Sequence, residues 1–171
     1  MNEPYLLAPG IVPRYSPLRA RQNSPRLKLS DSALRAMIDF LRDPPLTVAE
    51  DFGVEQAIDR MFRQGVRALL VVRDRGVVGL MTATQAARIR PHQLRVADVM
   101  TPTEDVPAID WDTLGEACVG DLVEIFSGTG VNHLVVLQTQ SAILSSVRGL
   151  IHRERLERQL RSPWSLRAGM I

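Results

Sequence analysis

The sequence predicts an α/β (α+β) fold made of two similar units, each with the order strand, helix, strand, strand, helix. Two runs carry this prediction, ALLVV at 68–72 and HLVVL at 133–137, since short apolar β-branched runs are typical of strands buried on both faces. A Gly-Leu-apolar step then follows each run, at 79–81 and at 149–151. Because three strands and two short helices form a marginal core alone, we expect the two units to pack through their sheets.

The first unit follows from periodicity and from its turn residues. Its helix places apolar residues on one face and ends at Gly65, a residue type favoured just after a helix. The turn Asp74-Arg75-Gly76 separates two strands. The expected elements are a strand at 46–51, a helix at 53–65 with Val54, Ala57, Ile58, Met61 and Phe62 inward, strands at 68–73 and 77–82, and a short helix at 83–90.

The second unit repeats this order after the linker PHQLRVADVMTP. Thr113 and Glu116 have the spacing of a capping box, so one helix is expected from there to Phe126. We expect its Ile125-Phe126 pair to match Met61-Phe62 of the first unit. The other expected elements are strands at 105–110, 133–137 and 147–151, and a helix formed by HRERLERQL, 152–160.

Three segments lie outside the two units. Residues 1–29 hold five of the eleven prolines and are expected to form an extended Pro/Arg-rich arm. Residues 30–43 predict a helix, with Leu34, Met37, Ile38 and Leu41 in one stripe and Pro44 at its end. The predicted organisation is arm 1–29, helix 30–43, first repeat 44–91, linker and second repeat 92–160, and C-terminal tail 161–171.

Composition narrows the possible functions. The net charge is only +2, but both ends are basic and the body is acidic. The single cysteine, Cys118, is expected in a helix core; no zinc spacing is present, and His92, His133 and His152 lack metal-ligand spacing. No apolar run reaches the length of a membrane helix, and no signal peptide is evident, so a cytoplasmic protein is expected. No set of nucleophile, base and orienting group is present, so an enzyme is not expected.

The repeated order, the glycine before each LLVV-like run and the linker VADVMTP at 96–102 resemble a tandem pair of cystathionine-β-synthase (CBS) domains, a Bateman module. This resemblance covers residues 44–160. It implies a disc-like homodimer of modules, with clefts between the repeats that bind adenine nucleotides such as AMP, ADP or ATP, or S-adenosylmethionine. Such a ligand would be regulatory, and no cofactor is required.

The family's strand-end pattern is glycine, two apolar residues, Ser or Thr, two variable residues and then Asp, whose carboxylate accepts from both ribose hydroxyls. The first repeat has Thr82 at the Ser/Thr position and Gln85 at the Asp position. The second has His152 and Arg155 there. Gln85 offers one uncharged acceptor and Arg155 offers only donors, so the family's ribose contact is missing from both repeats.

Each candidate residue has a functional and a structural interpretation. Thr82 would bind a ligand hydroxyl or cap the following helix. His152, Arg153 and Arg155 would form a phosphate-binding corner or a solvated helix face supported by ion pairs. The candidate nucleotide-binding residues are Arg67, Thr82, Gln85, Thr101, His133, His152, Arg153 and Arg155.

Three functions are open on the sequence. The first is a non-catalytic regulatory protein that senses an adenine nucleotide or other adenosyl ligand and modulates a partner protein. The second is a ligand-free scaffold, an accessory or structural subunit that joins a larger complex through residues 1–29. The third and weakest is nucleic-acid binding through the basic ends, which lack interleaved aromatic residues.

Overall fold

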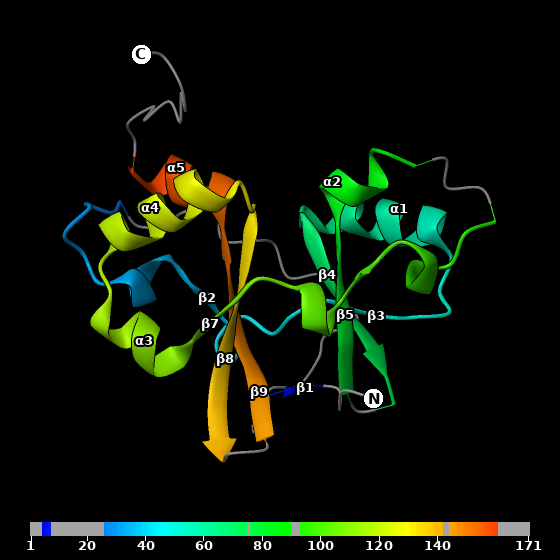
Figure 1. Ribbon diagram of the computed structural model, residues 1–171. Coiled ribbons are helices and arrows are strands. Elements are labelled where there is room, and N and C mark those ends of the chain that lie inside the picture. The colour runs from blue at the N-terminus through cyan, green and yellow to red at the C-terminus, as the bar shows by residue number, and fades with distance from the viewer. Residues whose placement is uncertain (1–4, 8–25, 75, 90–92, 142–143, 161–171) are drawn as a thin grey trace.

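The computed structural model describes residues 5–7, 26–74, 76–89, 93–141 and 144–160, which form two similar halves side by side (Figure 1). Helices α1 and α2 of one half and α4 and α5 of the other lie at the upper end of the view, and each long hairpin extends downward away from them. The first half contains β3 (Thr47–Ala49), α1 (Val54–Gln64), β4 (Ala68–Arg73), β5 (Gly76–Thr82) and α2 (Ala83–Ala86). The second contains β7 (Ala108–Asp110), α4 (Val119–Thr129), β8 (His133–Ser141), β9 (Leu144–His152) and α5 (Arg153–Leu160). The predicted order is therefore confirmed in both repeats.

Strand pairing is the same in the two repeats. β3 is parallel to β4 and β7 is parallel to β8, as expected for strands joined by a helix. The hairpins β4–β5 and β8–β9 are antiparallel. Even the irregularity recurs, because the register shifts between Val71 and Val72 in one hairpin and between Val136 and Leu137 in the other.

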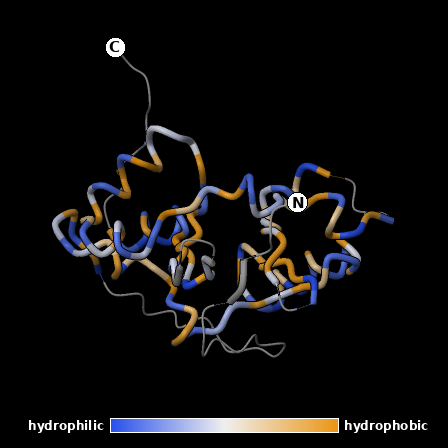
Figure 2. The backbone as a smooth tube through the Cα atoms, turned by 60° about the horizontal axis from the view of Figure 1, so that its bottom comes forward, coloured by the Kyte–Doolittle hydropathy of each residue, from blue (hydrophilic) through white to orange (hydrophobic). Residues whose placement is uncertain are grey.

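Three apolar clusters account for the sequence pattern of the middle strands. Leu69 and Val71 of β4 pack under α1 and α2, while Leu70 lies in a central cluster that both repeats share. β8 alternates in the same way, so both strands are buried on both faces and need continuous apolar runs. Figure 2 shows apolar stretches in both halves. The central cluster, which joins the repeats through their sheets as predicted, comprises Phe40, Leu70, Val77, Leu80, Val135, Val147 and Leu150.

The predicted helix over 30–43 is wrong. Only Ala33–Ala36 is helical, as a 3-10 turn, and Met37 is extended. The next residues form β2 (Ile38–Asp39), which pairs antiparallel with β9 of the second repeat. Pairing with β9 overrides the helical spacing of the apolar residues here. A turn follows β2, in which Phe40 is buried while its neighbour Leu41 is 47% exposed.

A matching strand precedes the second repeat, so the repeats exchange these strands. β6 (Thr101–Pro102), flanked by the 3-10 turns η2 (Val96–Asp98) and η3 (Thr103–Asp105), pairs with β5 of the first repeat. Each short strand passes close to the glycine of the Gly-Leu-apolar step. A Cβ on Gly79 would lie 2.7 Å from the Thr101 carbonyl oxygen, and one on Gly149 would lie 2.6 Å from that of Ile38. Both glycines therefore serve close backbone approach.

The single helix predicted from Thr113 to Phe126 is also wrong, because two helices occupy this region. α3 (Trp111–Glu116) is capped by the side chain of Asp110, and α4 starts after Cys118. The break follows from pairing with the N-terminal segment, since Ala33 N–H donates to the Ala117 carbonyl and Gly120 N–H donates to that of Leu29. These bonds hold residues 117 and 118 in an extended conformation.

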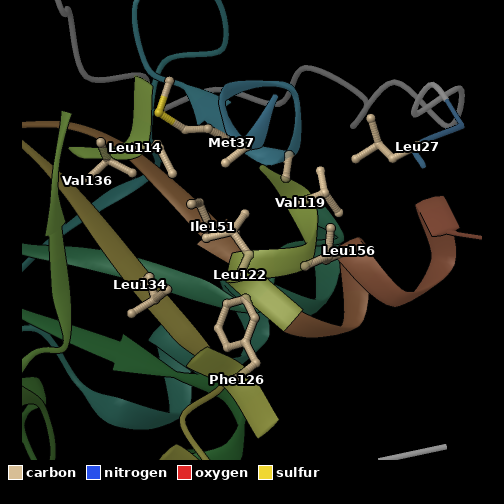
Figure 3. Close-up of a cluster of buried hydrophobic side chains, with 12 residues drawn as sticks. Leu27, Met37, Leu114, Val119, Leu122, Phe126, Leu134, Val136, Ile151 and Leu156 are labelled. Atoms are coloured by element: carbon tan, nitrogen blue, oxygen red, sulfur yellow. The ribbon is translucent and has the colours of Figure 1, made fainter. Parts of the chain in front are cut away.

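The predicted inward position of Phe62 is a third correction, since its side chain is 86% exposed. Helices α1 and α4 both span eleven residues and end at left-handed glycines, Gly65 and Gly130. Counting back from these glycines aligns Met61, rather than Phe62, with the fully buried Phe126. Figure 3 shows Phe126 within the core of the second repeat, beside Leu122 and below Ile151.

Part of the N-terminal arm forms a strand between the two repeats. β1 (Tyr5–Leu7) pairs antiparallel with β5 and parallel with β9. The hydrogen-bonded strand order is therefore β3-β4-β5-β1-β9-β8-β7. The rest of the predicted arm up to residue 25, and the predicted tail 161–171, lie outside the described residues. Within the described part of the chain, no helix has both the length and the apolar character to cross a membrane.

Candidate ligand-binding corners between the repeats

Seven of the eight predicted site residues gather at two equivalent junctions, where the last strand of each repeat meets its last helix. We call the first the α2 corner, formed by Thr82, Gln85 and Thr101. The second is the α5 corner, formed by His133, His152, Arg153 and Arg155. In Figure 1 both junctions lie at the helical end of the molecule.

In the α2 corner, the side chain of Gln85 joins three elements. Its Oε1 accepts from the Thr82 backbone N–H at 2.7 Å and from Thr82 Oγ1 at 2.8 Å. Its Nε2 donates to Thr101 Oγ1, on the exchanged strand β6, at 2.6 Å. Thr82 Oγ1 in turn accepts from the Gln85 backbone N–H, which completes a capping box.

The predicted capping role of Thr82 is therefore confirmed, and the α2 corner is satisfied from within. The only acceptor oxygen of the Gln85 side chain already receives two hydrogen bonds. A ribose placed here would have to displace the contact with Thr101 and would meet no carboxylate. This corner is built to hold the end of β5 against α2 and β6.

The α5 corner is built around two histidines. His133 opens β8 and lies directly opposite His152, the last residue of β9. The rings meet edge to face with centroids 4.4 Å apart, and each side chain is about nine-tenths buried. The equivalent pair in the first repeat is Ala68 and Thr82, so this pair of rings is specific to the second repeat.

Both histidines are held neutral. Burial lowers the pKa of His133 to about 4, with a further contribution from His152 and an opposing one from Glu154. Burial also lowers the pKa of His152 to about 4, and the positive charges of Arg158, Arg67 and Arg155 act in the same direction. A neutral imidazole keeps one donor and one acceptor nitrogen for other groups.

Three buried nitrogens of this corner have no hydrogen-bond partner among the described residues: His133 Nε2, His152 Nδ1 and Arg155 Nε. Burial lowers the pKa of the Arg155 guanidinium, while the nearby carboxylate of Asp43 raises it. Buried polar groups are nearly always paired in proteins. Three such nitrogens at one junction therefore mark the α5 corner as the place where an outside group would be held.

The other two predicted cations already have partners. Arg153 donates from Nε to Glu157 Oε1 at 3.2 Å and from Nη1 to the Phe126 carbonyl at 3.4 Å. Arg67, at the start of β4 in the first repeat, forms an ion pair with Glu154 of α5 at 3.4 Å. Glu154 also approaches Arg158 at 3.8 Å, one of the predicted helix-face pairs. The Arg67–Glu154 pair brings the first repeat to the edge of the α5 corner.

Sequence reasoning did not count Asp43 or Arg158 among the site residues, and it missed a largely buried ion pair between Asp39 and Arg148. Arg148 of β9 binds both carboxylate oxygens of Asp39 on β2, and its guanidinium lies 4.8 Å from the ring centre of Trp111. These residues fix the exchanged strand on β9. The usable signal was the isolated arginine in the apolar segment VRGLI, since a charge within a buried strand needs a partner.

A separate apolar pocket lies between the repeats, toward the starting ends of β5 and β9. None of the eight predicted site residues lines it, and its exposed wall is entirely apolar. We therefore base the candidate site on the unpaired nitrogens of the α5 corner. The pocket is lined by Leu70, Val77, Gly79, Leu80, Thr103, Val106, Ala108, Val135 and Val147.

No group of three His, Cys, Asp or Glu side chains within the described ranges is placed to hold a metal ion. Cys118, predicted in a helix core, instead precedes α4 and is only half-buried. Its backbone N–H donates to the Asp121 carboxylate at 2.7 Å, which helps start the helix. Cys118 is therefore the N-cap residue of α4.

The sequence of residues 37–91 matches the family model of the CBS domain. Residues 37–91 of this chain are therefore a CBS domain. The match begins at Met37, immediately before β2, rather than at the predicted residue 44. The second repeat keeps the CBS order of elements but carries α3, His152 and Arg155 as departures. No curated protein matches this sequence.

Solved CBS structures share the fold. A CBS-domain protein from Burkholderia ambifaria MC40-6 is 23% identical, with a TM-score of 0.53 over 70% of this chain and 84% of its own. CBSX2 in complex with AMP is 16% identical, with a TM-score of 0.56 over 75% and 94%. The CBS domain of a bacterial CNNM/CorC family Mg²⁺ transporter in complex with ATP is 12% identical, with a TM-score of 0.57 over 77% and 88%. Each likeness extends over more than one repeat.

Proposed function

We propose that this CBS-domain protein is a non-catalytic regulator that binds an adenine nucleotide or other adenosyl ligand at its α5 corner and thereby modulates a partner protein. The observation that carries the proposal is the set of unpaired buried nitrogens on His133, His152 and Arg155. Leaving a buried polar group unpaired costs about 1–3 kcal/mol. A ligand that supplies acceptors at this junction would recover part of that cost.

The charges of the α5 corner favour the phosphate part of such a ligand. Arg67, Arg155 and Arg158 all act on His152, and guanidinium groups bind phosphate oxygens with charge-assisted hydrogen bonds. The carboxylate that would accept from ribose hydroxyls is replaced by Arg155. We therefore expect recognition to rest on the phosphates, with nucleotides bound more tightly than adenosine.

The α2 corner supports a stoichiometry of one ligand per chain. Its polar groups satisfy one another through Gln85, so it offers no unpaired group to a ligand. The AMP and ATP complexes among the similar structures support an adenine nucleotide as the ligand class. Regulation would follow if the ligand favours one arrangement of the repeats and the partner binds that arrangement better.

Thermal shift and calorimetry with AMP, ADP, ATP, S-adenosylmethionine and cyclic di-AMP test this proposal. We expect at least one nucleotide to raise the melting temperature, because a ligand that binds only the folded state stabilises it. Arg155→Ala should abolish that shift. Arg63→Ala is the matched control, since Arg63 is exposed on α1 and pairs only locally with Asp59. Absence of stabilisation by every ligand at millimolar concentration would refute the proposal.

A ligand-free scaffold is the second candidate, and the self-satisfied α2 corner favours it. In that case the arm would dock the protein on a larger complex. The structure sharpens the test, because Leu27 is buried and Leu29 binds α4 through its carbonyl. Deleting residues 1–25 rather than 1–29 should leave the body folded, as circular dichroism would show, but abolish the pull-down of the partner. A retained pull-down would exclude the arm as the docking element.

The family resemblance also implies a homodimer, which we retain as part of the proposal. Sedimentation velocity at micromolar concentration would measure it. A monomer of the chain's 19.0 kDa mass would contradict this part without affecting the proposed ligand site.

A further inference from the structure

The strand β1 has an unusual place in the fold, because it pairs with both repeats. Tyr5 pairs only with Val77 of β5, Leu7 pairs only with Val147 of β9, and Leu6 pairs with both strands. Each repeat is therefore held through two positions of a three-residue strand. The same residues of β5 and β9, Val77 and Val147, line the apolar pocket between the repeats. β1 thus pairs directly with two residues whose side chains line this pocket.

We infer that β1 is a detachable clasp: residues 5–7 hold the repeats together at the pocket end, and their release lets the repeats move and exposes the pocket. A strand of three residues is at the short end of the range found in proteins, and each repeat pairs with it at only two positions. β1 reaches the body of the protein through residues 8–25, a stretch of eighteen residues. Loss of β1 would therefore not require any other described strand to leave its sheet.

The clasp and the ligand corners lie at opposite ends of the same two strands. β1 pairs near the starts of β5 and β9, whereas the α2 and α5 corners lie where these strands end. Between them lie Leu80 and Leu150, the part of the central cluster that is nearer the corners. If a ligand draws the repeats together at the corners, they pivot on this packed cluster and separate at the clasp. Locking the clasp should therefore weaken ligand binding, a part of the inference that rests on the proposed function.

The clasp itself can be tested on the full chain without any ligand. Leu6→Pro removes a backbone N–H from the middle of β1, whereas Leu6→Ala keeps it and serves as the control. Hydrogen exchange should become at least about tenfold faster at Gly76–Val77 and Ser146–Val147 in Leu6→Pro, with little change in β4 and β8. A dye that fluoresces on apolar surfaces should bind Leu6→Pro more strongly than Leu6→Ala. Unchanged exchange and dye binding in Leu6→Pro would overturn the inference.

A disulfide provides the locked form. Tyr5 and Val77 lie directly opposite in antiparallel strands, at a Cα separation suited to a disulfide. Tyr5→Cys/Val77→Cys should close within one chain, seen as a monomer on a non-reducing gel, with Cys118 shown to be free by mass spectrometry. A covalent dimer would place residues 5–7 on a second copy and overturn the intrachain clasp.

The reduced and oxidised forms of this variant then measure the coupling. We expect the oxidised form to bind the nucleotide found by thermal shift at least about fivefold more weakly than the reduced form. Equal affinity would overturn the coupling while leaving the ligand site intact. If no nucleotide binds either form, the proposed function fails, and the exchange and dye experiments still decide whether β1 is a clasp.

Discussion

The amide of Gln85 ties together the end of β5, the start of α2 and the exchanged strand β6. Sequence position suggested a weakened ribose contact, since Gln85 stands where the CBS pattern has Asp. Its reach to Thr101 explains why a longer amide is useful here. An aspartate is one methylene shorter, so it would not make the same bridge from α2 to β6. Gln85 thus makes a hydrogen bond to Thr101 within the protein, where an aspartate would offer a carboxylate to a ligand.

Restoring the carboxylate should reverse that exchange. We expect Gln85→Asp to lower the free energy of unfolding by about 1–2 kcal/mol through loss of the Thr101 bridge. It should also raise nucleotide stoichiometry from one to two per chain, because a charged acceptor becomes available to the ribose. Urea unfolding and calorimetry measure the two effects. Gln56→Asp, exposed on α1, is the control, and one ligand per chain in Gln85→Asp would contradict the role assigned to Gln85.

The buried histidine pair predicts a loss of stability at mildly acidic pH. The folded-state pKa of His133 and His152 is about 4, below the ordinary value of 6.5. Between these values the unfolded chain binds protons that the folded chain does not, so stability is full above pH 6.5 and falls as the pH drops toward 4. Each histidine should account for a loss on the order of 3 kcal/mol over that range.

The variant His133→Ala/His152→Thr, which installs the residues of the first repeat, isolates this effect. Its stability should change much less between pH 7 and pH 5 than that of the natural chain, as measured by urea unfolding at each pH. His92 is present in both proteins, so its titration cancels in the comparison. The same pH slope in both proteins would show that the two histidines are not held neutral by the fold.

At the scale of elements, the exchanged strands β2 and β6 depend on two glycines. A methyl group at Gly79 or Gly149 would meet a backbone carbonyl of the passing strand at 2.7 or 2.6 Å. Backbone cannot move aside as a flexible side chain can. We therefore expect Gly79→Ala and Gly149→Ala each to lower the free energy of unfolding by about 1–3 kcal/mol.

Gly128 provides the matched control for these glycine variants. It lies within α4 and has no atom within 4 Å of its would-be Cβ, so Gly128→Ala should be neutral or stabilising by up to about 1 kcal/mol. Chemical denaturation of the three variants measures the contrast. Equal effects at all three positions would show that the strands do not pack tightly on the hairpins.

The sequence predicted well those elements whose side chains contact residues nearby in the sequence, or are buried among apolar residues on both faces. ALLVV was predictable because both faces of β4 are buried, and Thr82 because its capping partner is three residues away. β2 was missed because its apolar spacing also fits a helix, and only pairing with β9, about 110 residues later, decides between them. The break before α4 has the same kind of cause, since residues 29–33 impose it.

The sequence predicted which residues lie in the candidate site, but it did not predict how those residues contact one another. His152 and Arg155 were found from their place in the strand-end pattern, and His133 from its place before an apolar run. That the two rings face each other depends on hairpin register, and that Gln85 binds Thr101 depends on a contact sixteen residues away. Sequence spacing carries neither fact. The three-dimensional structure added the contacts between residues of different strands and helices.

At the scale of the whole molecule, the exchanged strands and the shared central cluster should make the two repeats unfold together. β2 lies before the first repeat in sequence but packs on the second, and β6 does the reverse. Neither repeat is complete without the other. We therefore expect one cooperative transition in urea despite the internal duplication.

Trp111 allows this expectation to be tested. In a Trp164→Phe background its fluorescence reports on the second repeat, where it contacts Arg148, while circular dichroism reports on both repeats. The two signals should change at the same urea concentration. Adding Gly79→Ala, in the first repeat, should shift both midpoints equally. If Gly79→Ala left the midpoint of the Trp111 fluorescence transition unchanged, the repeats would unfold independently.

The exchange of β2 and β6 also bears on how this chain can change over evolution. Each repeat of the sequence packs partly against residues that precede the other repeat. Met37 covers Gly149 of the second repeat, and Met100 covers Gly79 of the first. A substitution at Met37 or Met100 would therefore change the packing around a glycine of the other repeat. Descendants of the original duplication should therefore vary in correlated pairs that link the repeats.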